Sequence, residues 1–203
     1  MPAGQPSGRR RYDLKINMKY VEGKNYKGEN FAETEISEFE NCAFTNCVFA
    51  NADLSNIEFS ECEFEDCDLS LAKLHDTSLK TVEFINCKLL GLRFNDCKQF
   101  LLEFNFKNCI LNFASFHKLK LKNIRFEDCK LEEVDFTETD LTKAVFKNCD
   151  LKRTVFENTI LESADLRTSF NFSIDPNGNR INKAKFSIQN ITGLLEKYNI
   201  TIE

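Results

Sequence analysis

Cysteine is the residue type in this chain that could take part in the widest range of chemistry, since thiolates bind metals, form disulfides and act as nucleophiles. There are nine cysteines among 203 residues. No CxxC pair and no paired Cys/His ligand spacing occurs, so a tetrahedral zinc site has no support in the sequence. Six of the nine recur in one register, each preceded by Asn or Asp: Cys47, Cys67, Cys87, Cys109, Cys129 and Cys149. We expect buried free thiols that pack as small apolar groups.

Other residues that could support catalysis are sparse. His75 and His117 lie in no HExxH context, and the chain has no Gly-x-Ser-x-Gly motif. A phosphate-binding loop is equally missing, because four of the seven glycines precede residue 30. We therefore expect no enzymatic activity, no metal and no cofactor.

Acidic residues are concentrated near the start of the chain. Residues 21–70 contain two lysines and thirteen acids, a balance of −11, whereas residues 71–166 contain fifteen charges of each sign. The densest group is the acidic surface, defined as Glu58, Glu61, Glu63, Glu65, Asp66 and Asp68. Such a cluster can steer a basic partner toward the protein, or it can be a solvated face that aids solubility.

The first twenty residues have the opposite charge. Five basic residues and Asp13 give them a balance of +4, and residues 1–8 are rich in Pro, Gly and small polar residues. We expect residues 1–20 to form a disordered leader.

The elements that position these side chains follow from a repeat. Six copies of the phrase Phe-x-Asn/Asp-Cys begin at residues 44, 64, 84, 106, 126 and 146, with spacings of 20, 20, 22, 20 and 20. Inside each unit a large apolar residue recurs every five positions, a period that fits neither an α-helix nor a single β-strand. A small residue, usually Cys or Ala, lies two positions before each large one. The pattern predicts stacked coils over residues 21–166, with one large and one small side chain turned inward per five.

This pattern resembles the pentapeptide-repeat family, and 52–56 (Ala-Asp-Leu-Ser-Asn) and 164–168 (Ala-Asp-Leu-Arg-Thr) match its consensus. The resemblance implies an all-β fold, a right-handed quadrilateral β-helix in which four pentapeptides form one coil. On that fold Phe44, Phe64 and Phe84 stack in one inner column. The Asn or Asp before each repeated Cys falls at a corner, where such residues tolerate left-handed backbone. A calcium-binding or ice-binding ladder is a second interpretation of these corner residues.

The C-terminal part, residues 167–203, departs from the repeat. Residues 174–179 (Ile-Asp-Pro-Asn-Gly-Asn) predict a turn, Ser187 can cap a following α-helix, and residues 200–202 (Ile-Thr-Ile) predict a short strand. The apolar face of that helix consists of Ile188, Ile191, Leu194, Leu195 and Tyr198. We expect this face to cap the last coil, to form a homodimer, or to do both.

The chain also resembles the Qnr quinolone-resistance proteins and the related MfpA proteins. The resemblance lies in residues 25–29 (Asn-Tyr-Lys-Gly-Glu), residues 111–121 and the C-terminal segment 186–202. It implies a non-catalytic, DNA-mimicking homodimer that binds DNA gyrase or topoisomerase IV and lowers quinolone susceptibility. The alternative is a cytoplasmic scaffold whose protein target is unrelated to topoisomerases.

Two loops that interrupt the coil in Qnr proteins are absent at full length here. The 22-residue spacing leaves only a two-residue excess, which we assign to a coil-interrupting bulge containing Asn95, Asp96, Lys98, Gln99 and Phe100. No apolar run is long enough to span a membrane and no signal peptide is visible, so we expect a cytoplasmic protein without direct nucleic-acid binding.

Overall fold

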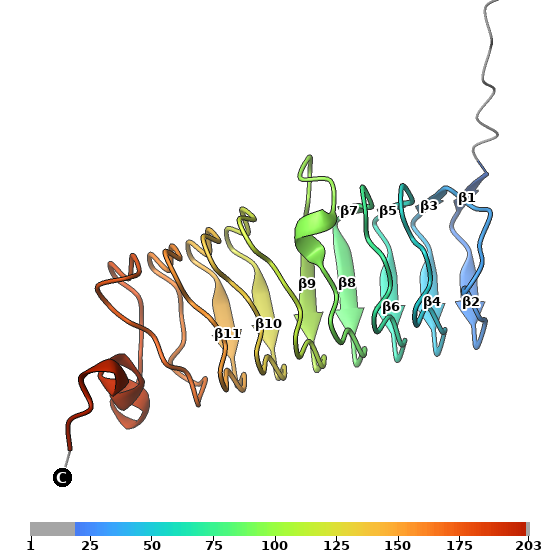
Figure 1. Ribbon diagram of the computed structural model, residues 1–203. Coiled ribbons are helices and arrows are strands. Elements are labelled where there is room, and N and C mark those ends of the chain that lie inside the picture. Colours follow the sequence, from blue (N-terminus) through green and yellow to red (C-terminus); the bar gives the residue numbers. More distant parts are fainter. Residues whose placement is uncertain (1–18, 202–203) are drawn as a thin grey trace, which may run out of the picture.

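The computed structural model describes residues 19–201, and these residues form one continuous rod of stacked coils (Figure 1). The coils are linked by parallel strand pairing, with each strand bonded to the strand about twenty residues later. The architecture is the right-handed quadrilateral β-helix expected from the sequence. The expected leader, residues 1–20, falls almost entirely outside the described residues, although Tyr20 already begins the first strand.

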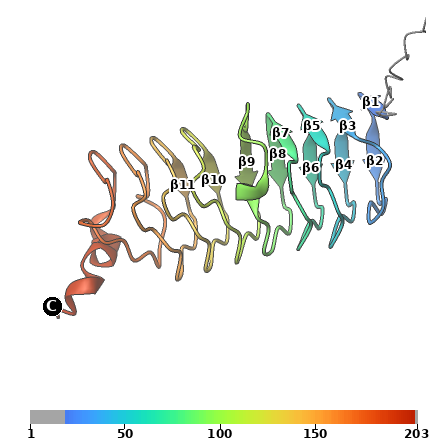
Figure 2. The ribbon, with the colours of Figure 1, turned by 45° about the horizontal axis from the view of Figure 1, so that its top comes forward.

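Two of the four faces are β-sheets. Face 1 consists of four strands: β1 (Tyr20–Glu22), β3 (Glu38–Glu40), β5 (Glu58–Ser60) and β7 (Ser78–Lys80). Face 2 consists of seven strands: β2 (Asn25–Lys27), β4 (Ala43–Thr45), β6 (Glu63–Glu65), β8 (Val82–Ile85), β9 (Phe104–Lys107), β10 (Arg125–Glu127) and β11 (Val145–Lys147). Figure 2 shows these strands stacked along the rod.

The other two faces are joined by single parallel bridges. Face 3 runs from Asn30 through Val48 and Asp68 to Phe170, and face 4 includes the bridges that link Ser115, Asp135 and Val155. Because neighbouring coils present the same backbone groups, the same bonding pattern recurs from coil to coil along most of the rod.

The predicted inner positions form the core. The large and the small residues of the repeat are buried along the whole rod, including Phe44, Phe64 and Leu166. Like residues stack on like: the rings of Phe44 and Phe64 lie 4.7 Å apart at an interplanar angle of 11°. The spacing of neighbouring coils brings aromatic faces into contact, so the Phe column is structural.

Small inner residues do more than fill space. All nine cysteines are free and buried. The Cys67 thiol donates to the carbonyl of Phe44 at 3.2 Å, and the Cys87 thiol donates in the same way to Phe64 at 3.2 Å. Thr139 makes the equivalent bond to Phe116 at 2.9 Å. The small position therefore supplies a side-chain hydrogen bond between coils, which pairs a buried carbonyl.

Corner residues adopt the left-handed backbone expected of them. Asn46, Asp66 and Asn86 have φ values of 53°, 56° and 56°. Asn and Asp occupy this region at lower cost than other non-glycine residues, which explains their recurrence before the six cysteines of the repeated phrase. Leu71 and Phe113 occupy another corner at φ 59° and 64°, an unusual conformation for large apolar residues.

The rod continues beyond the boundary expected at residue 166. Parallel bridges join Asp150 to Phe170, Ile160 to Arg180 and Asp165 to Lys185. The apolar period is lost here because polar side chains occupy inner positions, among them Ser169 and Asn179, and these donate to carbonyls of the preceding coil. The end of the apolar pattern at residue 166 therefore comes before the end of the rod.

The C-terminal helix differs from the predicted one. Instead of a single α-helix, the chain forms two 3₁₀-helices, η2 (Ile188–Leu194) and η3 (Glu196–Tyr198). Ser187 makes no capping hydrogen bond from its side chain. Gly193 lies so close to Phe172 that an added Cβ would be 2.3 Å from the Phe172 carbonyl oxygen, a contact that fixes the segment tightly against the last coil. Of the predicted strand, Ile200 and Thr201 are not in strand conformation, and Ile202 lies outside the described residues.

Candidate interaction surface

The six residues of the acidic surface surround one coil instead of forming a flat patch. Glu58 lies on face 1, Glu63 and Glu65 lie on face 2 within β6, and Asp68 lies on face 3. Glu61 and Asp66 occupy the corners between these faces, both with positive φ. The coil is thus negative on three sides.

Parallel pairing adds acids that the sequence grouping missed. Glu58 pairs in register with Glu38, and Glu63 pairs with Glu83. On face 1, Glu22 is likewise the partner of Glu40. Applying the twenty-residue offset to each acid would have revealed two of these pairs, because residues twenty apart lie on neighbouring strands. Like charges opposite each other destabilise a sheet, so this arrangement has an energetic cost.

Ion pairs distinguish the acidic end from the rest of the rod. Within residues 19–201, Glu61, Glu63 and Glu65 have no cationic partner, and neither do Asp66 and Asp68. Glu58 is the exception, since its carboxylate lies 2.5 Å from the Lys80 ammonium.

Further along the rod, acids are paired between coils. Glu127 contacts Lys147 at 2.5 Å, and Glu132 contacts both Lys152 and Arg153 at 3.0 and 2.6 Å. The hydrogen bond from Lys152 lowers the pKa of Glu132, and the bond to Glu127 raises the pKa of Lys147. The same scaffold can therefore neutralise its carboxylates, whereas five of the six residues of the acidic surface have no cation beside them among residues 19–201.

The bulge lies where face 1 is interrupted. Lys98 still donates from its backbone to Thr77, and Val82 is again in register with Phe104, so the two extra residues fall within 99–102. Of the predicted bulge residues, Gln99 and Phe100 lie in this segment, Lys98 precedes it, and Asn95 and Asp96 belong to η1 (Phe94–Asp96). In Figure 1 the segment is the tall loop between β8 and β9.

Two apolar side chains are exposed at the tip of the bulge. Phe100 is 76% exposed and Leu101 is 62% exposed, and Leu101 also has a positive φ of 56°. Leu101 is not among the five residues assigned to the bulge from the sequence, although its position beside Phe100 in an interrupted repeat could have indicated it. A shallow hollow beside the bulge is lined by Glu61, Lys80 and Leu102, which brings the bulge next to the acidic surface.

The C-terminal apolar residues divide into two groups. Leu194 is partly buried and packs against the core, and Leu195 is half-buried beside it. Ile188, Ile191 and Tyr198 face outward, with exposed fractions of 86%, 46% and 51%. The cap thus closes the last coil and still presents an apolar surface.

The described residues offer no metal-ion cluster and no membrane-spanning helix. Across residues 19–201, no group of three or more His, Cys, Asp or Glu residues is arranged to hold a metal ion. In the same part of the chain, no helix has the length and apolarity needed to cross a bilayer.

A rod of parallel coils with five-residue faces, a Phe column and asparagine corners defines the class of pentapeptide-repeat β-solenoids. The sequence model of the pentapeptide repeat region, a protein-family model, matches residues 37–105 and 93–170. The chain belongs to this family. No curated protein matches the sequence significantly.

Solved structures share the fold. A trypsin-treated, singly substituted variant of QnrB1, described as a plasmid-mediated fluoroquinolone resistance protein, superposes with a TM-score of 0.58 at 19% identity, covering 92% of this chain and 99% of that one. Full-length QnrB1 gives a TM-score of 0.53 at 20% identity, covering 89% and 100%. At this level of identity the likeness concerns the fold.

Proposed function

We propose that this protein is a non-catalytic rod that binds a type II topoisomerase, DNA gyrase or topoisomerase IV, through its acidic N-terminal coils and lowers susceptibility to quinolones. The main observation behind this proposal is the set of carboxylates that have no cationic partner in the described part of the chain and lie on neighbouring strands. Glu63 and Glu83, which are register partners, are the clearest case. An enzyme that binds DNA presents a basic surface to the phosphate backbone. A rod with closely spaced negative charges can occupy such a surface in place of DNA.

Three further observations support this function. The family is one of repeat proteins, and repeat proteins bind partners through outward residues. QnrB1, which has a similar fold, is described as a fluoroquinolone resistance protein. The exposed apolar bulge lies beside the acidic surface and adds a contact of different chemistry to the same region. We propose a cytoplasmic location, which suits a partner of this kind.

We also propose a homodimer formed through the C-terminal cap. The outward residues Ile188, Ile191 and Tyr198 are the part of the predicted set that remains available for a second copy. Leu194 contacts the core of its own chain, so its replacement would disturb the cap as well as an interface. The double variant Ile188→Glu and Ile191→Glu therefore tests the interface better than a substitution of Leu194. Light scattering of this variant should show the mass of a monomer.

Gyrase supercoiling with and without ciprofloxacin tests the main proposal. Micromolar protein should inhibit supercoiling or relieve ciprofloxacin-induced cleavage. A variant with Glu61→Gln, Glu63→Gln and Glu65→Gln should lose most of the effect. The matched control carries Glu133→Gln, Glu138→Gln and Glu162→Gln, which removes the same charge from coils where acids are paired. Equal activity of the two variants would contradict a role for the acidic surface.

The second candidate function is a scaffold whose protein target is unrelated to topoisomerases. The exposed Phe100 and Leu101 favour it, since an apolar bulge is suited to a protein surface and contributes nothing to DNA mimicry. Absence of both inhibition and protection by the unaltered protein would leave this function.

A further inference from the structure

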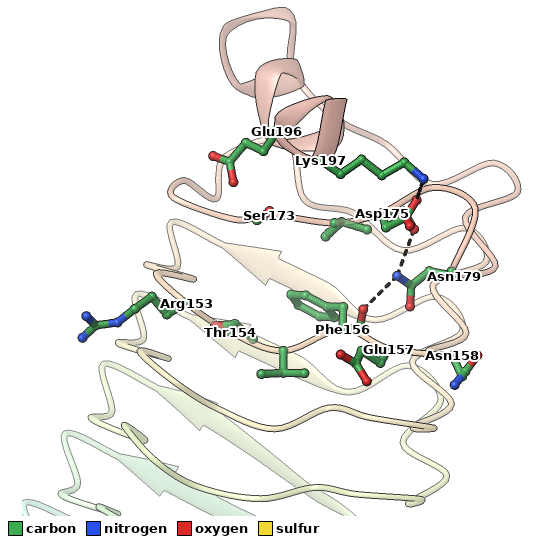
Figure 3. Close-up of a pocket in the computed structure, with 13 residues that line it drawn as sticks. Arg153, Thr154, Phe156, Glu157, Asn158, Ser173, Asp175, Asn179, Glu196 and Lys197 are labelled. Atoms are coloured by element: carbon green, nitrogen blue, oxygen red, sulfur yellow. Dashed lines mark hydrogen bonds and ion pairs between the residues drawn. The ribbon is translucent and has the colours of Figure 1, made fainter. Parts of the chain in front are cut away.

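We infer that the rod has a second binding site, an open strand edge at residues 153–157 that accepts one extended, basic peptide segment by β-augmentation. The site is far from the acidic surface and is independent of the function proposed above. It lies on face 4, beneath the C-terminal cap (Figure 3).

The edge is recognised by comparison with the coil before it. In that coil the backbone N–H groups of Glu133 and Phe136 donate to the following coil, to the carbonyls of Lys152 and Val155 at 3.0 Å each. The carbonyl of Val134 accepts from the N–H of Val155 at 2.8 Å. These three bonds make up the regular ladder of face 4.

One coil later, the three equivalent groups are unpaired. Within residues 19–201, the N–H groups of Arg153 and Phe156 and the carbonyl of Thr154 have no hydrogen-bond partner. Thr154 and Phe156 are each only 5% exposed. Buried backbone groups are nearly always paired in native proteins, so the open groups of Thr154 and Phe156, on one edge with the open N–H of the exposed Arg153, indicate a site for a further strand.

The ladder of face 4 is interrupted because the segment of the next coil forms a turn and does not pair with residues 153–156. Residues 175–178 form a turn in which Asp175 accepts from the N–H of Asn177 at 2.8 Å, and Pro176 has no N–H to give. The ladder resumes only where the N–H of Asn158 reaches the carbonyl of Gly178 at 2.9 Å. Asn179 locks this end by donating to the Phe156 carbonyl at 2.8 Å (Figure 3).

The resulting groove is large enough for a short segment of chain. Its volume is about 740 Å³, with Thr154 and Phe156 on one side and Ser173 and Asp175 on the other. Glu196 and Lys197 from η3 lie over the groove (Figure 3). An inserted strand would bond to the open edge with its backbone and would place an alternate side chain over Val155, which is 38% exposed.

The charges around the groove favour a basic occupant. Arg153 is neutralised by Glu132 and Glu133, each at 2.6 Å, and Lys197 pairs with Asp175. Glu157 and Glu196 have no ion-pair partner among residues 19–201. Two uncompensated carboxylates match lysine or arginine side chains placed two residues before and two residues after the residue over Val155, on the same outward face.

Amide hydrogen exchange in the full chain gives the first test. The amides of Arg153 and Phe156 should exchange much faster than those of Glu133 and Phe136, which occupy the same positions one coil earlier. If Phe156 exchanges as slowly as Phe136 in the free protein, the edge is closed and the inference is wrong.

Binding of acetyl-Lys-Val-Val-Val-Lys-amide, whose two lysines lie on the same face of an extended strand as its central valine, gives the second test. The peptide should slow exchange at Arg153 and Phe156 and shift their NMR signals, and N-methylation of its central valine should weaken binding about tenfold. Glu157→Lys with Glu196→Lys should have a similar effect, whereas the control Glu33→Lys should have none. NMR shifts confined to residues 58–68 would show that the peptide binds only to the acidic surface, and would overturn the proposal. So would about tenfold tighter binding to a chain that ends at Asn199, because the occupant would then be the protein's own C-terminal segment.

Discussion

The hydroxyl of Thr139 donates a hydrogen bond of 2.9 Å to the backbone carbonyl of Phe116, one coil earlier in the rod. Thr154, Thr159 and Ser169 make the equivalent bond to Leu131, Phe136 and Phe146. The small inner position of the repeat is therefore a donor position, which explains how a fully buried threonine is tolerated in an apolar core.

Replacing this donor should destabilise the rod. Thr139→Val keeps the shape of the side chain and leaves the Phe116 carbonyl unpaired, so the free energy of unfolding should fall by about 1–3 kcal/mol. Thr139→Ser should retain most of the stability. Thr137→Val, two residues away and partly exposed, is the control and should change stability by less than about 0.5 kcal/mol. Urea denaturation measures all three, and equal effects at 137 and 139 would argue against the hydrogen bond.

Substitutions at the corners should either lower or raise the stability of the rod, depending on the residue replaced. Asn86→Val places a β-branched residue at φ 56° and should cost about 1–2 kcal/mol. Leu71→Asn relieves a large residue held at φ 59° and should stabilise the rod by about 0.5–1 kcal/mol. Thermal unfolding of the two variants provides the measurement. A loss of stability in Leu71→Asn would mean that the Leu71 side chain, which lies against Gly91, contributes more than its backbone strain costs.

Thiol ionisation should make the rod sensitive to alkaline pH. Burial raises the pKa of Cys62 and of Cys97 from 9.0 to about 12, and the pKa values of Cys47 and Cys67 are raised as well. The unfolded chain releases these protons near pH 9 while the folded chain keeps them, so this contribution to stability is complete below that pH and is lost as the pH rises toward 12. Urea titrations at about pH 8 and about pH 10.5 should show the decline, and Cys62→Ala should reduce its slope.

The same burial predicts chemical inertness. In the native protein none of the nine thiols should react quickly with a disulfide reagent, and all nine should react after denaturation without reductant. Fewer than nine reactive thiols in the denatured chain would reveal a disulfide.

The cap depends on one glycine. Gly193→Ala would place a methyl group 2.3 Å from the Phe172 carbonyl oxygen, so η2 must move away from the last coil. We expect a loss of about 1–3 kcal/mol. Increased exposure of Phe172, measured by hydrogen exchange around residues 172–174, should accompany it. Gly178→Ala is the control, because its added Cβ meets nothing closer than 3.7 Å.

The sequence by itself determined the architecture, the core and the corners. The five-residue period and the family resemblance that it carries predicted a coil in which Phe44, Phe64 and Phe84 are all buried, and the Asn or Asp of each repeated phrase suits the left-handed backbone at its corner. These features repeat, so each copy confirms the others, and local residue preferences agree with the global fold.

Only the tertiary structure decided what happens where the repeat is irregular. Asn179 continues the rod with a hydrogen bond that hydropathy cannot reveal, and the contact of Gly193 with Phe172 accompanies a 3₁₀-helix in place of an α-helix. The pairing of Glu63 with Glu83 and the open edge at Phe156 depend on which residues of neighbouring coils face each other. Such relationships belong to pairs of residues distant in sequence, and the physical cost or benefit arises only when the coils are stacked.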